Sequence, residues 1–219
     1  MMTDFHLPYF INYAQPVAED IVIFCVALLT AIMVSAEGQA FVATMLGDSR
    51  KNPKDRLHFN VFLHMSVLGT INFFVAGFGW AKEIDIDTAK FKNHPKLFLI
   101  ISRMAGPFAN LLMANIVASI NWILGRYGIE DKVFSTIVVV NVTMAVYSLL
   151  VVPPLPGAAF IFAFFPHNSL FQNIKRHLCR IGPFVLVGTF LVVRFTGWTG
   201  ISSIFSPVVD ALAGAILNK

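Results

Sequence analysis

Runs of about twenty apolar residues recur along this 219-residue chain, and a helix of that length crosses the hydrocarbon core of a bilayer. Apolar residues make up 57% of the chain and charged residues 13%, with a mean hydropathy of +0.73. A soluble domain carries roughly twice that share of charge. The sequence therefore predicts an all-α polytopic membrane protein. We expect its partners to be lipid and other membrane protein subunits, and no nucleic acid.

The apolar runs divide the chain into three regions. We expect an interfacial N-terminal segment at 1–20, a membrane core at 21–180 and C-terminal membrane helices at 181–219. The core is expected to contain three main helices, at 21–46, 97–124 and 133–152. The C-terminal region has apolar runs at 181–195 and 200–217, after a basic loop at 167–180.

Residues 59–80 are apolar and uncharged but contain His64, Asn72 and three glycines. The basic loops on either side carry four Lys or Arg each, and the 167–180 loop carries three. If 59–80 enters and leaves by one face, all eleven lie on the cytoplasmic side, against Arg126 and Lys132 outside. The positive-inside rule therefore favours a re-entrant element, with a full crossing as the alternative. We expect an integral membrane protein.

Several segments together form a family pattern. They are AFVATMLGD (40–48), DRLHFNVFLH (55–64), FGWAKEIDID (78–87), SRMAGPFANLLMA (102–114) and AVYSLLVVPPLPGAAF (145–160). Over roughly residues 20–215 the chain resembles the short bacterial form of the site-2 proteases, which are intramembrane metalloproteases. The resemblance implies a three-helix core around the active cavity, the 59–80 element packed against it, and apolar helices at the C-terminus. It also implies an integral protein of a bacterial inner membrane, cytoplasmic or intracytoplasmic.

The chain departs from this family where the metal would bind. The family's His-Glu-x-x-His motif, with two zinc-binding His and a Glu base, is replaced by Ser35, Ala36 and Gln39, and its third ligand, an Asp, by Pro156. A catalytic zinc needs three protein ligands and one open position, and a base to activate water. We therefore expect no metal, no cofactor and no catalytic residue, with these four positions as relics of a lost site.

The favoured function is that of a non-catalytic pseudoprotease serving as an accessory subunit of a larger membrane complex, and not an enzyme. One alternative is a regulatory binder of transmembrane clients, because a cleft that once held a substrate can still bind a helix or strand. A residual intramembrane metalloprotease is less favoured. An unconventional enzyme or ion carrier would use Glu37 and His64. The partner complex and the organism are not indicated by the sequence.

A few polar residues lie inside apolar runs, where they form buried contacts or meet partners. Glu37 is expected to pair with Arg103 or His64, with proton handling as the alternative. His64 has no ligand-type neighbour in the sequence, so it is interpreted as a packing histidine. Arg103 is expected to snorkel to the interface, or to contact a lipid headgroup. Asn110 and Asn141 are expected to hydrogen-bond across the helix bundle.

Overall fold

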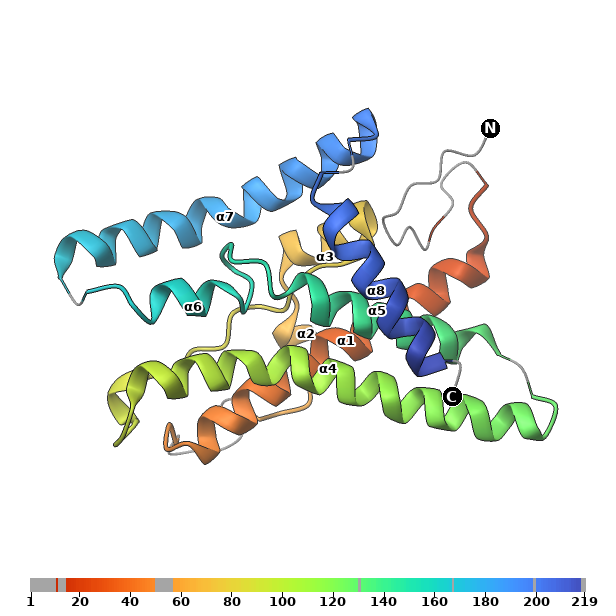
Figure 1. Cartoon of the computed structure of the whole chain (residues 1–219), viewed down its shortest axis with the longest axis horizontal. Helices are drawn as coiled ribbons and strands as arrows, with labels where there is room; N and C mark the ends of the chain where they lie inside the picture. The colour runs from red at the N-terminus through yellow and green to blue at the C-terminus, as the bar shows by residue number, and fades with distance from the viewer. Residues whose placement is uncertain are drawn as a thin grey trace.

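The computed structural model describes residue 11 and residues 15–49, 57–129, 131–166, 168–198 and 200–217. Helices are the only named elements in these ranges apart from a 3-10 turn, η2 (Thr88–Lys90) (Figure 1). They are α1 (Ala18–Met45), α2 (Val61–His64), α3 (Val67–Ala76), α4 (Pro95–Arg126), α5 (Lys132–Tyr147), α6 (Ala158–Phe162), α7 (Ser169–Thr196) and α8 (Ser202–Leu217). The expected all-α architecture is confirmed.

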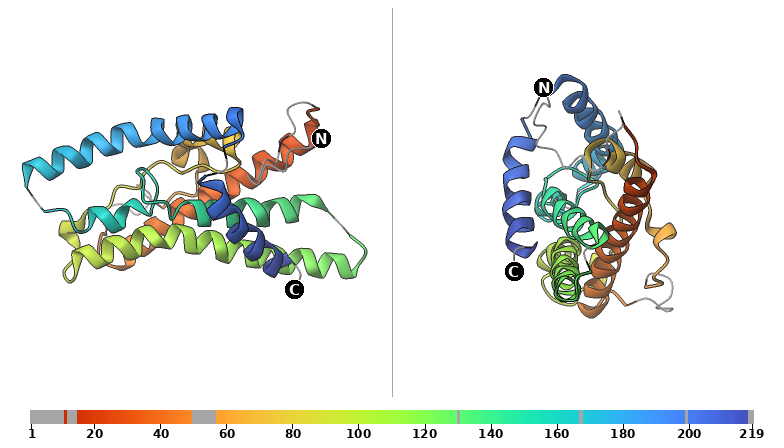
Figure 2. Two further views of the ribbon diagram at one scale, coloured as in Figure 1. Left: turned by 45° about the horizontal axis from the view of Figure 1, so that its top comes forward. Right: turned by 90° about the vertical axis from the view of Figure 1, so that its right-hand side faces the viewer.

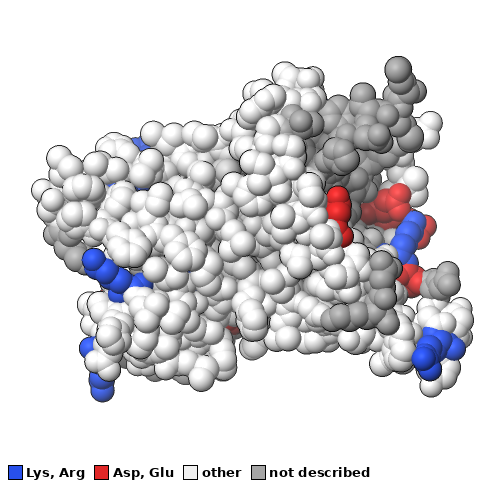
Figure 3. All heavy atoms as spheres, viewed as in Figure 1, with Lys and Arg blue, Asp and Glu red and all other residues white. Residues whose placement is uncertain are grey.

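Three of the helices, α1, α4 and α7, are long and apolar enough to cross a membrane. On the face shown in Figure 3 the charged side chains gather near the two ends of the molecule, and the broad middle is uncharged. This distribution is typical of a protein with its middle in hydrocarbon and its ends at the headgroups. The chain is therefore an integral membrane protein.

The observed helices differ from the predicted ones in two places. The helix predicted at 133–152 ends at Tyr147, where the chain continues in tight turns, and Gly157 N donates to Ser148 O at 2.9 Å across the segment that contains Pro153 and Pro154. The basic loop predicted at 167–180 is wrong, since α7 begins at Ser169, where the Asn168 side chain accepts a bond from Phe171 N at 2.9 Å. Lys and Arg are good helix formers, so the basic residues continue the helix.

The three-region division of the chain stays a prediction, although its boundary at 180/181 falls inside α7. The N-terminal segment at 1–20 lies mostly outside the described residues, and α1 begins at Ala18.

Helices α1, α4 and α5 pack together as the centre of the molecule; in the right view of Figure 2, α4 and α5 are seen roughly along their axes and α1 runs obliquely beside them. Small residues allow α1 and α4 to approach closely. A Cβ on Gly38 would lie 2.7 Å from Ala109 Cβ, and one on Gly106 would lie 2.8 Å from Ser35 Oγ. The side of α1 that carries Ser35, Gly38 and Gln39 therefore faces α4.

The 59–80 segment is broken into the short helices α2 and α3. The ten residues of α3 extend about 15 Å at 1.5 Å per residue, half the thickness of the hydrocarbon core. The helix ends at Gly77, which has a left-handed φ of 76°, and Asn72 Nδ2 then donates to Phe78 O at 2.8 Å. Helix α3 packs against α7. The re-entrant interpretation stays a prediction, and the short helices are compatible with it.

Candidate metal centre

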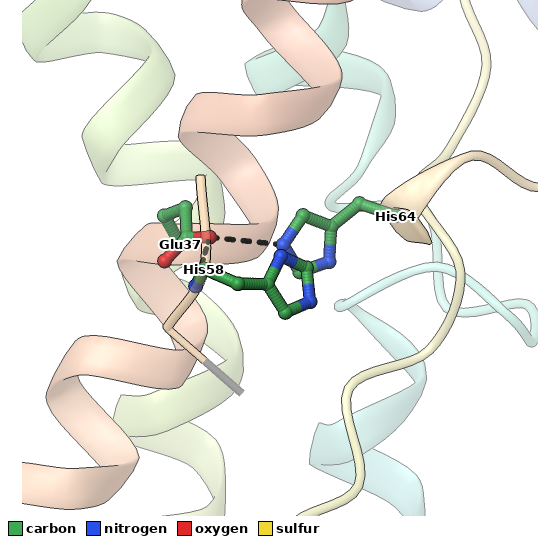
Figure 4. Close-up of side chains that lie close together, drawn as sticks. All are labelled: Glu37, His58 and His64. Atoms are coloured by element: carbon green, nitrogen blue, oxygen red, sulfur yellow. Dashed lines mark hydrogen bonds and ion pairs between the residues drawn. The ribbon is translucent and has the colours of Figure 1, made fainter. Parts of the chain in front are cut away.

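Three side chains of metal-ligand type meet beside α1 (Figure 4). Glu37 belongs to α1, His64 ends α2, and His58 lies in the segment that leads into α2. One ligand atom from each of the three lies within 4.8 Å of the others. Glu37 and His64 are buried and His58 is half-buried.

Hydrogen bonds to one carboxylate oxygen hold this cluster together. Glu37 Oε1 accepts from Phe59 N at 2.8 Å and from His58 N at 3.3 Å, and it lies 3.0 Å from His64 Nε2. The His58 ring stacks on the His64 ring, with centroids 4.4 Å apart. Phe59 has a φ of 50°, a left-handed conformation that non-glycine residues rarely adopt. The backbone turn at this residue therefore brings both histidines to the same carboxylate.

The cluster fits a metal cation in two respects. Its donor set, two imidazoles and one carboxylate, is one of the sets that hold catalytic zinc and leave a fourth position open. In addition, Glu37 Oε2 is buried and has no hydrogen-bond partner among the described residues. A buried carboxylate oxygen without a partner is costly, and a bound cation would satisfy it.

The cluster corrects the sequence interpretation of His64. No ligand-type neighbour of His64 was apparent in the sequence apart from Glu37 as a possible partner, but the structure places both Glu37 and His58 next to it. Of the two partners considered for Glu37, the structure shows His64. His58 was missed because it precedes His64 by six residues across a break between irregular backbone and helix. The only available signal was the pair of histidines close in sequence near an intramembrane acid.

Three of the four relic positions, Ser35, Ala36 and Gln39, belong to α1, and Pro156 lies in the turn between α5 and α6. Ser35 and Gln39 contact the α4 surface at Gly106, and Ala36 is fully buried. Ser35, Gln39 and Pro156 line one hollow, so the fold does bring these positions of the family motif together. None of them carries a side chain that binds zinc well.

Arg103 lies at the same hollow. Its side chain is only 13% exposed, with Nη2 2.7 Å from Glu83 Oε1 and Nη1 3.2 Å from Gln39 Oε1. The expected snorkelling of Arg103 to the interface is therefore not what the structure shows. The guanidinium is instead held inside the protein, between α1 and the segment that contains Glu83.

The two asparagines are fully buried, but no cross-helix bond from either is seen in the described ranges. Asn141 Nδ2 donates to Ile137 O at 2.8 Å within α5. Among the described residues, Asn110 Nδ2 and Oδ1 and Asn141 Oδ1 have no hydrogen-bond partner. The predicted bonds across the bundle are therefore absent from this part of the chain.

Taken together, the long apolar helices and the buried His/Glu cluster define an integral membrane protein with a candidate metal centre. No protein-family model and no solved structure matches the chain. Over 145 residues the chain is 32% identical to a protein of Bacillus subtilis (strain 168) named "Putative zinc metalloprotease YwhC". The match covers 62% of this chain and 66% of the relative's length, just under two thirds. This similarity supports a site-2 protease-like family for the chain.

These findings overturn the prediction of a non-catalytic pseudoprotease that is not an enzyme. The relative carries the name of a zinc metalloprotease, and the structure brings Glu37, His58 and His64 into one possible metal site. The error has a physical origin. The prediction considered only the positions of the family motif. Folding instead brings Glu37 together with His58 and His64, which follow it by 21 and 27 positions in the chain.

Proposed function

We propose that this protein is a membrane-embedded zinc metalloprotease, located in a bacterial inner membrane, with its metal held by Glu37, His58 and His64. The observation that carries the proposal is the buried cluster of one carboxylate and two imidazoles, in which Glu37 Oε2 lacks a partner among the described residues. The similarity to the Bacillus subtilis relative supports the same class of reaction.

The residues of the cluster would act in different ways. A zinc ion bound there would lower the pKa of a water molecule and polarise the carbonyl of a peptide bond. Glu37 Oε1 orients His64 and the 58–59 backbone through its three contacts. The burial of Glu37 and His64 keeps bulk water away, which strengthens electrostatic interactions at the site.

The surface next to the cluster suits an apolar substrate segment. Phe59, Phe62 and Leu63 are 72%, 73% and 59% exposed and flank the two histidines in sequence. A transmembrane peptide that approaches through the lipid would contact these side chains before it reaches the cluster. We therefore propose that the substrates are membrane-spanning segments. Contacts of the enzyme with lipid and with other membrane protein subunits stay a prediction.

The test compares the zinc content and the cleavage activity of detergent-purified variants altered at the Glu37 cluster or on the side of α1 that faces α4. Zinc per chain is measured by mass spectrometry of the metal, and cleavage is measured on a labelled transmembrane peptide. We expect stoichiometric zinc and cleavage in the wild type, and loss of both in Glu37→Gln and His64→Asn. Gln39→Ala is the matched control, because it alters the same helix on the side facing α4 and should retain zinc.

Circular dichroism and size exclusion would verify that each variant stays folded. Zinc at the level of the buffer in the wild type would refute the proposal. Equal zinc in Glu37→Gln and wild type would refute the ligand set, even if cleavage were observed.

A further inference from the structure

Two small hollows adjoin beside Arg103 of α4, and neither is lined by the Glu37 cluster. They share Glu83, Arg103, Pro154 and Pro156, and we refer to the two together as the groove. One end of the groove is lined by Ser35 and Gln39, and the other by Phe162 of α6 with Lys175 and Cys179 of α7. None of the three residues in the proposed metal site lines it.

Three basic residues, Lys82, Arg103 and Lys175, and one carboxylate, that of Glu83, line the groove. Arg103 is nearly enclosed, and Lys175 Nζ lies 5.3 Å from the centre of the Phe162 ring. Glu83 is half exposed and occupies Nη2 of Arg103 at 2.7 Å. A guanidinium has five N–H donors, so the bonds of Arg103 to Glu83 and Gln39 leave capacity for a further acceptor. The groove therefore keeps a net positive charge and already binds one oxyanion, that of Glu83.

The outer end of the groove opens among exposed apolar side chains. On α6 and α7 these include Phe160, Ile161, Ile174 and Leu178, which are 44%, 46%, 39% and 42% exposed. Helix α7 is itself long and apolar enough to span the membrane, and little of its apolar stretch is buried by the protein. Acyl chains cover such a surface in a bilayer.

Charge and apolar surface together indicate one occupant. We propose that the groove binds an anionic phospholipid, with its phosphate at Arg103 and Lys175 and its acyl chains along α6 and α7. Basic pockets between membrane helices on the cytoplasmic side are suited to anionic headgroups. The basic residues predicted on the cytoplasmic side place this end of α7 in the leaflet that contains such lipids. This site is independent of the proposed protease activity.

Glu83 allows the direction of a change in lipid affinity to be predicted. Its carboxylate competes with the lipid phosphate for Arg103, so Glu83→Gln should strengthen lipid binding. Arg103→Gln and Lys175→Gln should each weaken it about fivefold, the effect expected for one basic side chain near an anionic phosphate. Among the described residues Lys175 makes no hydrogen bond or ion pair, whereas Arg103 bonds to Glu83 and Gln39, so the Lys175 variant tests the site even if Arg103→Gln fails to fold.

Native mass spectrometry of the full chain in detergent would measure retained phosphatidylglycerol against phosphatidylcholine with identical acyl chains. We expect preference for phosphatidylglycerol in the wild type, a smaller preference in Lys175→Gln and a larger one in Glu83→Gln. Arg126→Gln is the matched control, since Arg126 lies at the other end of α4, over the Trp122 ring. Equal retention of the two lipids would overturn the proposal. An equal loss of the phosphatidylglycerol preference in Arg126→Gln and Lys175→Gln would also overturn it.

A second measurement uses the thiol in the groove. The chain has two cysteines, so Cys25→Ser leaves Cys179 as the single site for a maleimide. Labelling of Cys179 should be slower in nanodiscs of phosphatidylglycerol than in nanodiscs of phosphatidylcholine. The difference should shrink in Lys175→Gln. Equal labelling rates in the two lipids would contradict occupation of the groove.

Discussion

Gly106→Ala tests how closely α1 and α4 must pack to build the groove. A Cβ at this position would lie 2.8 Å from Gln39 Nε2, 2.8 Å from Ser35 Oγ and 3.0 Å from Ser35 O. The two side-chain atoms can rotate away, but the backbone oxygen moves only if the helices separate. Rotation of Gln39 would also disturb its 3.2 Å bond to Arg103.

The expected change in the free energy of unfolding of Gly106→Ala is the sum of opposing effects. Overpacking of this kind costs about 1–3 kcal/mol, and the close backbone contact places Gly106→Ala toward the upper end. Loss of a hydrogen bond to a charged group adds about 1.5 kcal/mol or more when Gln39 rotates. Alanine in place of glycine in a helix recovers about 1 kcal/mol. We expect a net destabilisation of about 2 kcal/mol or more.

Unfolding in detergent micelles, followed by circular dichroism, would measure the effect. Gly125→Ala is the matched control on the same helix, because a Cβ there meets no atom within 4 Å. It should stabilise the protein by up to about 1 kcal/mol through helix propensity alone. If Gly106→Ala were as stable as Gly125→Ala, the reasoning from close helix packing would be refuted.

Three further substitutions test other contacts by the same unfolding measurement. Arg194→Gln removes bonds of 2.8 and 3.3 Å to two carbonyls at the end of α3 and should cost about 1–3 kcal/mol, and a stability equal to wild type would show that these bonds contribute nothing. Asp48→Asn removes the charge of a fully buried carboxylate that pairs with Lys90 at 3.4 Å and should lower stability by about 1–3 kcal/mol; a stability equal to wild type would argue against the ion pair. Tyr147→Phe should cost less than about 1 kcal/mol and Tyr147→Ala about 3–5 kcal/mol, because the buried ring stacks 4.3 Å from Phe78, and equal losses would instead assign the stabilisation to the hydroxyl.

The helical architecture was largely predictable from the sequence. The free energy of transferring a helix into the bilayer is a sum over the residues of that helix. A long apolar run therefore indicates a membrane helix whatever other segments pack against it. The predicted ranges 21–46 and 97–124 lie within a few residues of α1 and α4. The start of α7 was missed because a cluster of basic residues, which a helix tolerates, was interpreted as a loop.

The candidate site was only partly predictable. Glu37 and His64 were singled out because polar groups in apolar segments are costly and must find partners. His58 was not, since its place depends on the irregular backbone at 57–60 and the left-handed turn at Phe59. No periodic pattern in the sequence describes such a turn.

The sequence by itself determined that this is a helical membrane protein. Only the tertiary structure decided which polar groups meet. Glu37 lies next to His58 and His64 on one side of α1, whereas Gln39, two residues later, accepts a hydrogen bond from Arg103 on another side. The physical reason is that successive residues of a helix point about 100° apart, so the chemistry of each side of α1 depends on the segment packed against it.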